Sequence, residues 1–172
     1  MTDLDTQQRT PRRNLHATMT PMHTPDAPGI IGIGYEGKTS EQLIRELDLW
    51  QIDVVVDVRL NPISRKKGLS KTALREALAG AGIRYEHRRE LGNPKENRAG
   101  FWDPGTAAHQ HARETFADIL KAEAASPALE ELVYLAGHER VALLCFEASE
   151  RCCHRAVILA EVKSALSRLA AV

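Results

Sequence analysis

The sequence predicts a three-layer α/β domain: a mostly parallel sheet of about four strands with helices on both faces. Short apolar runs alternate along the chain with segments whose apolar residues recur at helical spacing. This alternation is typical of a parallel sheet with right-handed crossovers. One run, 54–56, is three consecutive valines, which suits a strand covered on both faces by helices. The expected order of elements is βαβαβααβα.

The first half of the chain supplies three strands and two helices. A strand over 30–35 ends in a glycine-rich turn, and a strand over 53–58 contains the valine run. Between them, a Thr-Ser-Glu-Gln sequence at 39–42 resembles the capping box that starts a helix. A second helix begins near Ser70, and residues 83–85 form the third strand.

The second half supplies two more helices, the last strand and a terminal helix. A polar loop rich in glycine and proline covers 88–105, and loops of this length are usually functional or mobile. A helix follows it, and Ser126 with Pro127 marks the start of the next helix. The last strand covers 141–146, and the terminal helix begins near Cys153.

The chain is expected to hold one folded domain and one disordered tail. Residues 1–28 have no apolar period and are rich in Thr, Pro, Arg and Asp, so they cannot offset their ordering entropy. Met19 and Met22 are alternative start sites to Met1. Residues 29–172 form a single domain, because 43% of the chain is hydrophobic and its length suits one core.

Composition narrows the class of protein and its partners. The 23 basic and 23 acidic residues balance, which argues against a bulk polyelectrolyte partner but allows a local basic patch. No run of 18 apolar residues predicts a membrane span, and we expect no secretory signal. Three cysteines, two of them adjacent, make no disulfide framework, so we expect a cytoplasmic protein with free thiols.

Ionisable residues follow the predicted strands at the points where the strands end. Ligands of parallel sheets bind outside the carboxyl ends of the strands, so we expect these groups to share one polar pocket. The candidates are Tyr35 and Glu36 after the first strand, Asp57, Arg59 and Arg65 after the second, His87 after the third, and Glu147, Cys153, His154 and Arg155 after the last.

Four of these residues are candidate catalytic groups. Glu36, Asp57 and Glu147 suit acid–base or nucleophilic work, since paired carboxylates divide such roles when their surroundings separate the two pKa values. For Asp57 the alternative is structural, a carboxylate that accepts a bond from an arginine or an amide and holds a loop. Cys153 is a candidate nucleophile, because free amides at a helix start and a nearby arginine lower the pKa of a thiol. Its alternative is a buried packing residue.

The remaining candidates are expected to bind substrate. Guanidinium forks match phosphate and carboxylate oxygens, so the arginines are expected to hold an anion, either a small molecule or part of a nucleic acid. His87 has a structural alternative as a hydrogen-bonded histidine. The predicted binding set is Tyr35, Arg59, Arg65, His87, His154 and Arg155.

No metal and no cofactor are expected. Cys145 lies inside an apolar strand, and the adjacent Cys152 and Cys153 lack the paired spacing of a zinc site. The chain has no phosphate-binding loop, and Gly32 and Gly34 are not followed by the third glycine of a dinucleotide fingerprint.

The successive motifs resemble those of the domain of unknown function 488 family, over about residues 30–165. They are Gly34-Tyr35-Glu36-Gly37, Asp57-Val58-Arg59, Asn61-Pro62-x-Ser64-Arg65, Tyr85-x-His87, Leu91-Gly92-Asn93-Pro94 and Cys145-Phe146-Glu147 with Cys153-His154-Arg155. The resemblance implies a compact α/β domain with a candidate site but no particular reaction.

Three functions remain open from the sequence. The first is a small enzyme acting on an anionic, nucleotide-like or nucleic-acid-derived substrate, with carboxylates reacting and arginines holding the anion. The second is a cysteine-dependent phosphatase or sulfur-transfer protein using Cys153. Cys145 and Arg151 have the phosphatase spacing, although the acidic residues between them disfavour an anion there. The third is a non-catalytic module that binds a nucleotide or nucleic acid.

Overall fold

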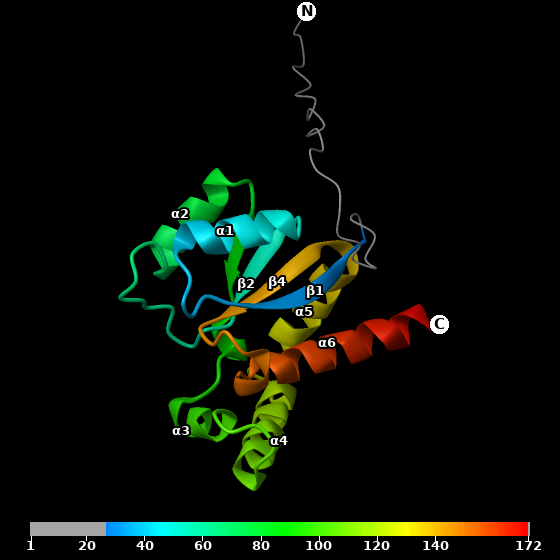
Figure 1. Cartoon of the computed structure of the whole chain (residues 1–172). Coiled ribbons are helices and arrows are strands. Elements are labelled where there is room, and N and C mark those ends of the chain that lie inside the picture. Colours follow the sequence, from blue (N-terminus) through cyan, green and yellow to red (C-terminus); the bar gives the residue numbers. More distant parts are fainter. Residues whose placement is uncertain (1–26, 172) are drawn as a thin grey trace, which may run out of the picture.

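The computed structural model describes residues 27–171, and the tail expected over 1–28 lies almost entirely outside them. The predicted three-layer α/β fold is confirmed (Figure 1). Its sheet is wholly parallel, with strand order β1-β4-β2-β3. The strands are β1 (Gly29–Gly34), β2 (Val54–Asp57), β3 (Arg84–His87) and β4 (Arg140–Cys145).

Two helices cover one face of the sheet and three cover the other. The first layer is α1 (Ser40–Leu49) and α2 (Lys71–Gly80); the second is α4 (Ala107–Lys121), α5 (Ser126–His138) and α6 (Arg155–Ala170). Alternate residues of the central strands point into the two layers. Val55 and Leu144 pack with α1 and α2, whereas Val56 and Leu143 pack with the other three helices.

The predicted helix starts follow local sequence closely at α1 and α2. Thr39 accepts a hydrogen bond from the Gln42 amide at 3.2 Å, and the Gln42 side chain accepts one from the Thr39 amide at 2.8 Å. This reciprocal pair confirms the capping box. The second helix begins beside Ser70, as predicted, with Ser70 as its N-cap residue by position, although the Ser70 side chain makes no capping bond.

Three local predictions need correction. The segment 88–105 is not one irregular loop but contains the short turns η1 (Arg89–Leu91), α3 (Lys95–Arg98) and η2 (Ala99–Phe101). Buried Leu91 and Phe101 anchor these turns to the core, which the polar composition concealed. Ser126 is the first residue of α5 rather than its cap.

The terminal helix starts at Arg155, because the short turn η3 (Glu150–Cys152) comes before it. This turn matters for the site, since it sets the place of Cys153 and His154 between the turn and α6. Over the described residues, no helix combines the length and apolarity needed to cross a membrane.

Candidate functional site

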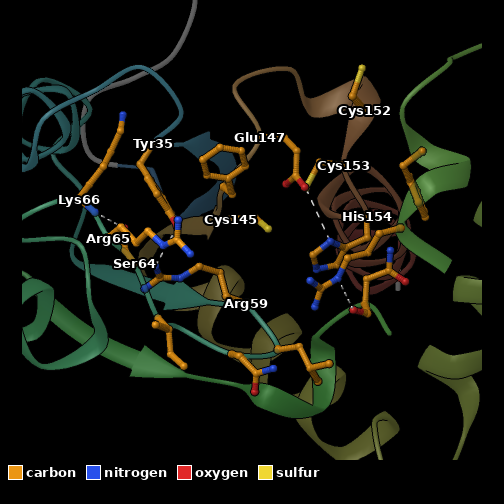
Figure 2. Close-up of a pocket in the computed structure, with 17 residues that line it drawn as sticks. Tyr35, Arg59, Ser64, Arg65, Lys66, Cys145, Glu147, Cys152, Cys153 and His154 are labelled. Carbon is orange, nitrogen blue, oxygen red and sulfur yellow. Dashed lines mark hydrogen bonds between the residues drawn. The ribbon is translucent and has the colours of Figure 1, made fainter. Parts of the chain in front are cut away.

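A cavity of about 410 Å³ opens at the carboxyl edge of the sheet (Figure 2). Its walls come from the end of β1, the loop after β2, the turns between β3 and α4, and the loop after β4. The register pairs Gly34 with Cys145 and Leu144 with Asp57, so the ends of these strands lie level. The cavity therefore occupies the edge at which the sequence predicts a polar pocket.

Part of the predicted residue set lines this cavity. The predicted residues that line it are Tyr35, Arg59, Arg65, Glu147, Cys153 and His154. The predicted residues outside the lining are Glu36, Asp57, His87 and Arg155. Of the three carboxylates and two arginines expected to face one cavity, Arg59 and Glu147 line it, whereas Glu36, Asp57 and Arg155 do not.

The floor of the cavity brings together two thiols and an imidazole. Cys145, Cys153 and His154 are all buried, and one ligand atom from each lies within 4.8 Å of the others. The Cys153 Sγ stands 3.7 Å from the His154 Nδ1. The His154 Nε2 lies 3.3 Å from the Val58 carbonyl oxygen. Because a carbonyl only accepts, the proton belongs on Nε2, and the Nδ1 lone pair faces the sulfurs.

The ionisable groups at the floor differ in the direction in which their pKa values are shifted. A hydrogen bond from Cys153 lowers the pKa of the Cys145 thiol to about 6. The same bond, together with burial, raises the pKa of Cys153. Burial acts to raise the pKa of Glu147, but contact with Cys153 and a backbone hydrogen bond outweigh it, and the pKa lies below the usual value. Of the two thiols, that of Cys145 therefore loses its proton more readily than that of Cys153.

The walls above the floor are mainly basic. The lining includes a single carboxylate, that of Glu147, but four basic residues: Arg59, Arg65, Lys66 and Arg98. Arg65 and Lys66 are exposed on the loop after β2. Arg98 comes from α3, and its Nε donates to the Asn93 carbonyl at 3.1 Å. Because Asp57 neutralises Arg59, the positive charge that favours an anion in the cavity comes from Arg65, Lys66 and Arg98.

Arg59 is held rigidly by a buried partner, Asp57. The Arg59 Nε lies 2.9 Å and 3.0 Å from the two Asp57 oxygens, and its Nη2 lies 2.5 Å from Oδ2. Its Nη1 donates to the Tyr35 hydroxyl and to the Leu69 carbonyl. Burial acts to lower the pKa of Arg59, but Asp57 outweighs it and raises that pKa. This geometry favours the structural alternative for Asp57.

Tyr85 completes the shell around Asp57 from the neighbouring strand. Its hydroxyl donates to Asp57 Oδ2 at 2.7 Å. Burial and the charge of Asp57 both raise the pKa of Tyr85. Both carboxylate oxygens of Asp57 thus accept bonds from named donors, and Asp57 is fully buried behind Arg59.

Three other predicted residues brace the loops around the cavity. Arg155, only 1% exposed, donates to the Ile33 carbonyl at 2.6 Å and to the Glu147 carbonyl at 2.8 Å. It therefore ties the end of β1 to the loop after β4. The Glu36 carboxylate accepts from the amide of residue 148 at 2.9 Å. The His87 Nε2 lies 2.9 Å from the Arg59 carbonyl oxygen, to which it donates.

One comparison with known proteins gives a match. The family model described as domain of unknown function DUF488 matches residues 39–162, more than half of the chain. The chain belongs to this DUF488 family. No curated protein and no solved structure matches it. The DUF488 match contains the floor and the basic wall of the cavity but begins after Tyr35 and Glu36.

The lining of this DUF488 chain also includes Cys145, Lys66 and Arg98, which the prediction from sequence left out of the site. Cys145 lies in an apolar strand and is buried, as the sequence predicts, but as the last residue of β4 it also lines the cavity. Its position at a strand end was the available signal. Lys66 and Arg98 also line the cavity, and only the spatial return of α3 to the sheet edge brings Arg98 there. Figure 2 shows Cys145 and Cys153 beside Glu147 and His154.

Proposed function

We propose that this DUF488 protein is a small enzyme that binds an anionic, nucleotide-like substrate and transforms it at the floor of the cavity. The observation that carries the proposal is the charge of the lining: Asp57 neutralises Arg59, and three further basic side chains, those of Arg65, Lys66 and Arg98, stand against the one lining carboxylate, Glu147. Such a lining attracts phosphate or carboxylate oxygens, and Arg65 is free to offer a planar fork because it stands exposed on its loop.

Two further features favour a small nucleotide over a polymer. The chain as a whole carries no net charge, which argues against a bulk polyelectrolyte partner. Phe146 lines the cavity and is partly exposed, and it packs edge-on against Tyr35 with ring centroids 5.4 Å apart. An exposed aromatic ring of this kind offers a stacking surface for a base.

Glu147 is the carboxylate best placed to react. It is the one member of the predicted carboxylate set in the lining, and it stands beside the thiols and the imidazole of the floor. A glutamate carboxylate is ionised at neutral pH, as a proton acceptor must be. We expect Glu147→Gln to retain binding and to lose turnover.

Binding is tested with inorganic phosphate, nucleoside monophosphates and a short single-stranded oligonucleotide, by thermal shift and calorimetry in low salt. A true ligand at 100 times its Kd adds about 2.7 kcal/mol to the stability of the native state. We expect Arg65→Ala to weaken the binding that is found by about 10- to 150-fold, since hydrogen bonds to charged groups contribute about 1.5–3 kcal/mol.

Lys67→Ala is the matched control, because Lys67 is exposed on the same loop but does not line the cavity. The proposal fails if none of the anions raises the melting temperature. It also fails if Lys67→Ala weakens binding as much as Arg65→Ala, since the anion would then be attracted by general surface charge.

A further inference from the structure

The three floor residues have the arrangement of a metal site with one open position. A tetrahedral zinc ion with Zn–S bonds of about 2.3 Å and Zn–N bonds of about 2.0–2.1 Å holds its ligand atoms roughly 3.6–3.8 Å apart. The Cys153 Sγ and His154 Nδ1 are 3.7 Å apart, and the Cys145 Sγ lies within 4.8 Å of both. One ion can therefore reach all three atoms after small side-chain movements.

The tautomer of His154 also suits metal binding. Its Nε2–H points to the Val58 carbonyl oxygen, which leaves the Nδ1 lone pair directed to the sulfurs. Metal-bound histidines almost always donate their other ring N–H to a carbonyl or a carboxylate, which fixes the ring and the tautomer. The imidazole also packs edge-on against Phe116, with centroids 5.0 Å apart, so its orientation is set before any ligand arrives.

A second observation at the same place points to a ligand. The Glu147 Oε2 is buried, and within residues 27–171 it has no hydrogen-bond partner. Figure 2 shows this carboxylate beside Cys153 and directed toward the floor. A buried acceptor without a donor is costly. A water on a metal ion at the floor would supply that donor.

We propose that Cys145, Cys153 and His154 bind one zinc ion, with the fourth coordination position open to the cavity. Two thiolates and an imidazole select zinc over the hard cations magnesium, calcium and manganese. Three protein ligands with an open position are typical of catalytic zinc, whereas structural sites close all four positions with protein ligands. All three ligands line the cavity, so the open position faces the basic wall.

The ligand set explains why spacing along the chain predicted no metal. The adjacent Cys152 and Cys153 do not suit a tetrahedral site, and the cluster uses Cys145 in place of Cys152. The end of β4 and the segment before α6 bring the ligands together across the loop. Cys152 is half-buried and is not part of the cluster.

The site deepens the proposed function, on which its catalytic meaning rests, because an anion held by the basic wall would lie over the open position. There the zinc ion would act as a Lewis acid or activate a bound water, and Glu147 would accept the proton of that water. The metal site itself needs no substrate, so its test stands apart from the test of anion binding.

The test is the metal content of the full-length protein, purified with reductant and without chelators. We expect one equivalent of zinc per chain, and we expect Cys145→Ser, Cys153→Ser and His154→Ala each to lose it. Cys152→Ser is the matched control and should keep its zinc. Because a ligand variant that unfolds would also lose its zinc, reduced wild-type protein is loaded with cobalt as a second test. Cobalt should give the intense visible bands of a tetrahedral site and a sulfur-to-cobalt charge-transfer band.

Two results would overturn the inference. One is reduced wild-type protein that holds less than a tenth of an equivalent of zinc and gives no tetrahedral cobalt spectrum. The other is a disulfide between Cys145 and Cys153 in metal-free protein, found by peptide mapping as the loss of two hydrogens. This result counts if treatment with reductant and zinc fails to convert the disulfide into a zinc-bound form. Either outcome leaves the anion-binding measurement intact, so the two proposals fail separately.

Discussion

Replacing Asp57 by asparagine tests whether that carboxylate supports the fold rather than reacting. The change keeps the size of the side chain but removes the charge that balances Arg59. Asp57 is fully buried and Arg59 is 5% exposed, so water cannot take over the lost interaction. The unpaired guanidinium would remain in the core, bonded only to the Tyr35 hydroxyl, the Leu69 carbonyl and the new amide.

The expected cost follows from this burial. Breaking a buried ion pair by removing one partner destabilises proteins by about 3–5 kcal/mol, because an uncompensated charge stays behind. For a domain of this size, each kcal/mol lowers the melting temperature by about 2–4 °C, so we expect a drop of roughly 6–20 °C. Asp118→Asn is the control: its pair with Lys121 is exposed, with side chains 80% and 71% accessible, and such pairs contribute about 0–1 kcal/mol.

The assay is urea unfolding at pH 7, followed by circular dichroism, with thermal unfolding as a second probe. The slope of the transition must stay constant for the difference in free energy to be meaningful. A loss below about 1 kcal/mol for Asp57→Asn would refute the reasoning, because it would mean that the pair contributes no more than a surface pair. A loss equal to that of Asp118→Asn would do the same.

Three further predictions test neighbouring parts of the fold by the same unfolding measurements. Tyr85→Phe should lower the free energy of unfolding by about 1.5–3 kcal/mol, the value of a hydrogen bond to a charged group. An unchanged stability would mean that the hydrogen bond from Tyr85 to Asp57 does not stabilise the fold. Asp53→Asn removes a carboxylate whose pKa is lowered: burial acts to raise it, but hydrogen bonds from the arginine at the start of β4 outweigh burial. The stability lost in this variant should be constant above about pH 5 and should shrink as the pH falls below about 4. A loss of stability that grows in acid would contradict this prediction. Gly34→Ala should lower the stability by at least about 1–3 kcal/mol, because the added Cβ would stand 1.9 Å from a backbone oxygen of the loop after β4. Gly80→Ala is the control: its Cβ would point into open space at the end of α2, and the change should raise the stability by about 0.4–1 kcal/mol.

Local patterns were sufficient to predict the layers of the fold. The three valines of β2 are all buried, and they contact helices on both faces, as a continuous β-branched run requires. The capping box at Thr39 depends on residues three apart, so the sequence contains the whole signal. The turns in 88–105 were missed because two buried residues, Leu91 and Phe101, do not form a periodic pattern.

The site was harder to predict because its contacts join distant segments. Strand ends identified the candidates, but nothing in the sequence says which carboxylate is already occupied. Asp57 is bonded to Arg59, two residues away, and to Tyr85, which reaches it only because β2 pairs with β3. Arg155 was expected at an anion, and its nitrogens instead donate to two backbone carbonyls, a role that depends on tertiary contacts alone.

Sheet order explains why the cavity lies at the end of β4 and leaves His87 outside. The chain leaves β1 and β2 toward the helical layer of α1 and α2, but it leaves β4 toward the opposite layer through α6 (Figure 1). Because β4 lies between β1 and β2, its neighbouring loops diverge on both sides, and a crevice opens there. The edge strand β3 has no strand beyond it, so His87 lies away from that crevice and braces Arg59 from outside. The same order makes the last residue of β4, Cys145, the centre of the floor.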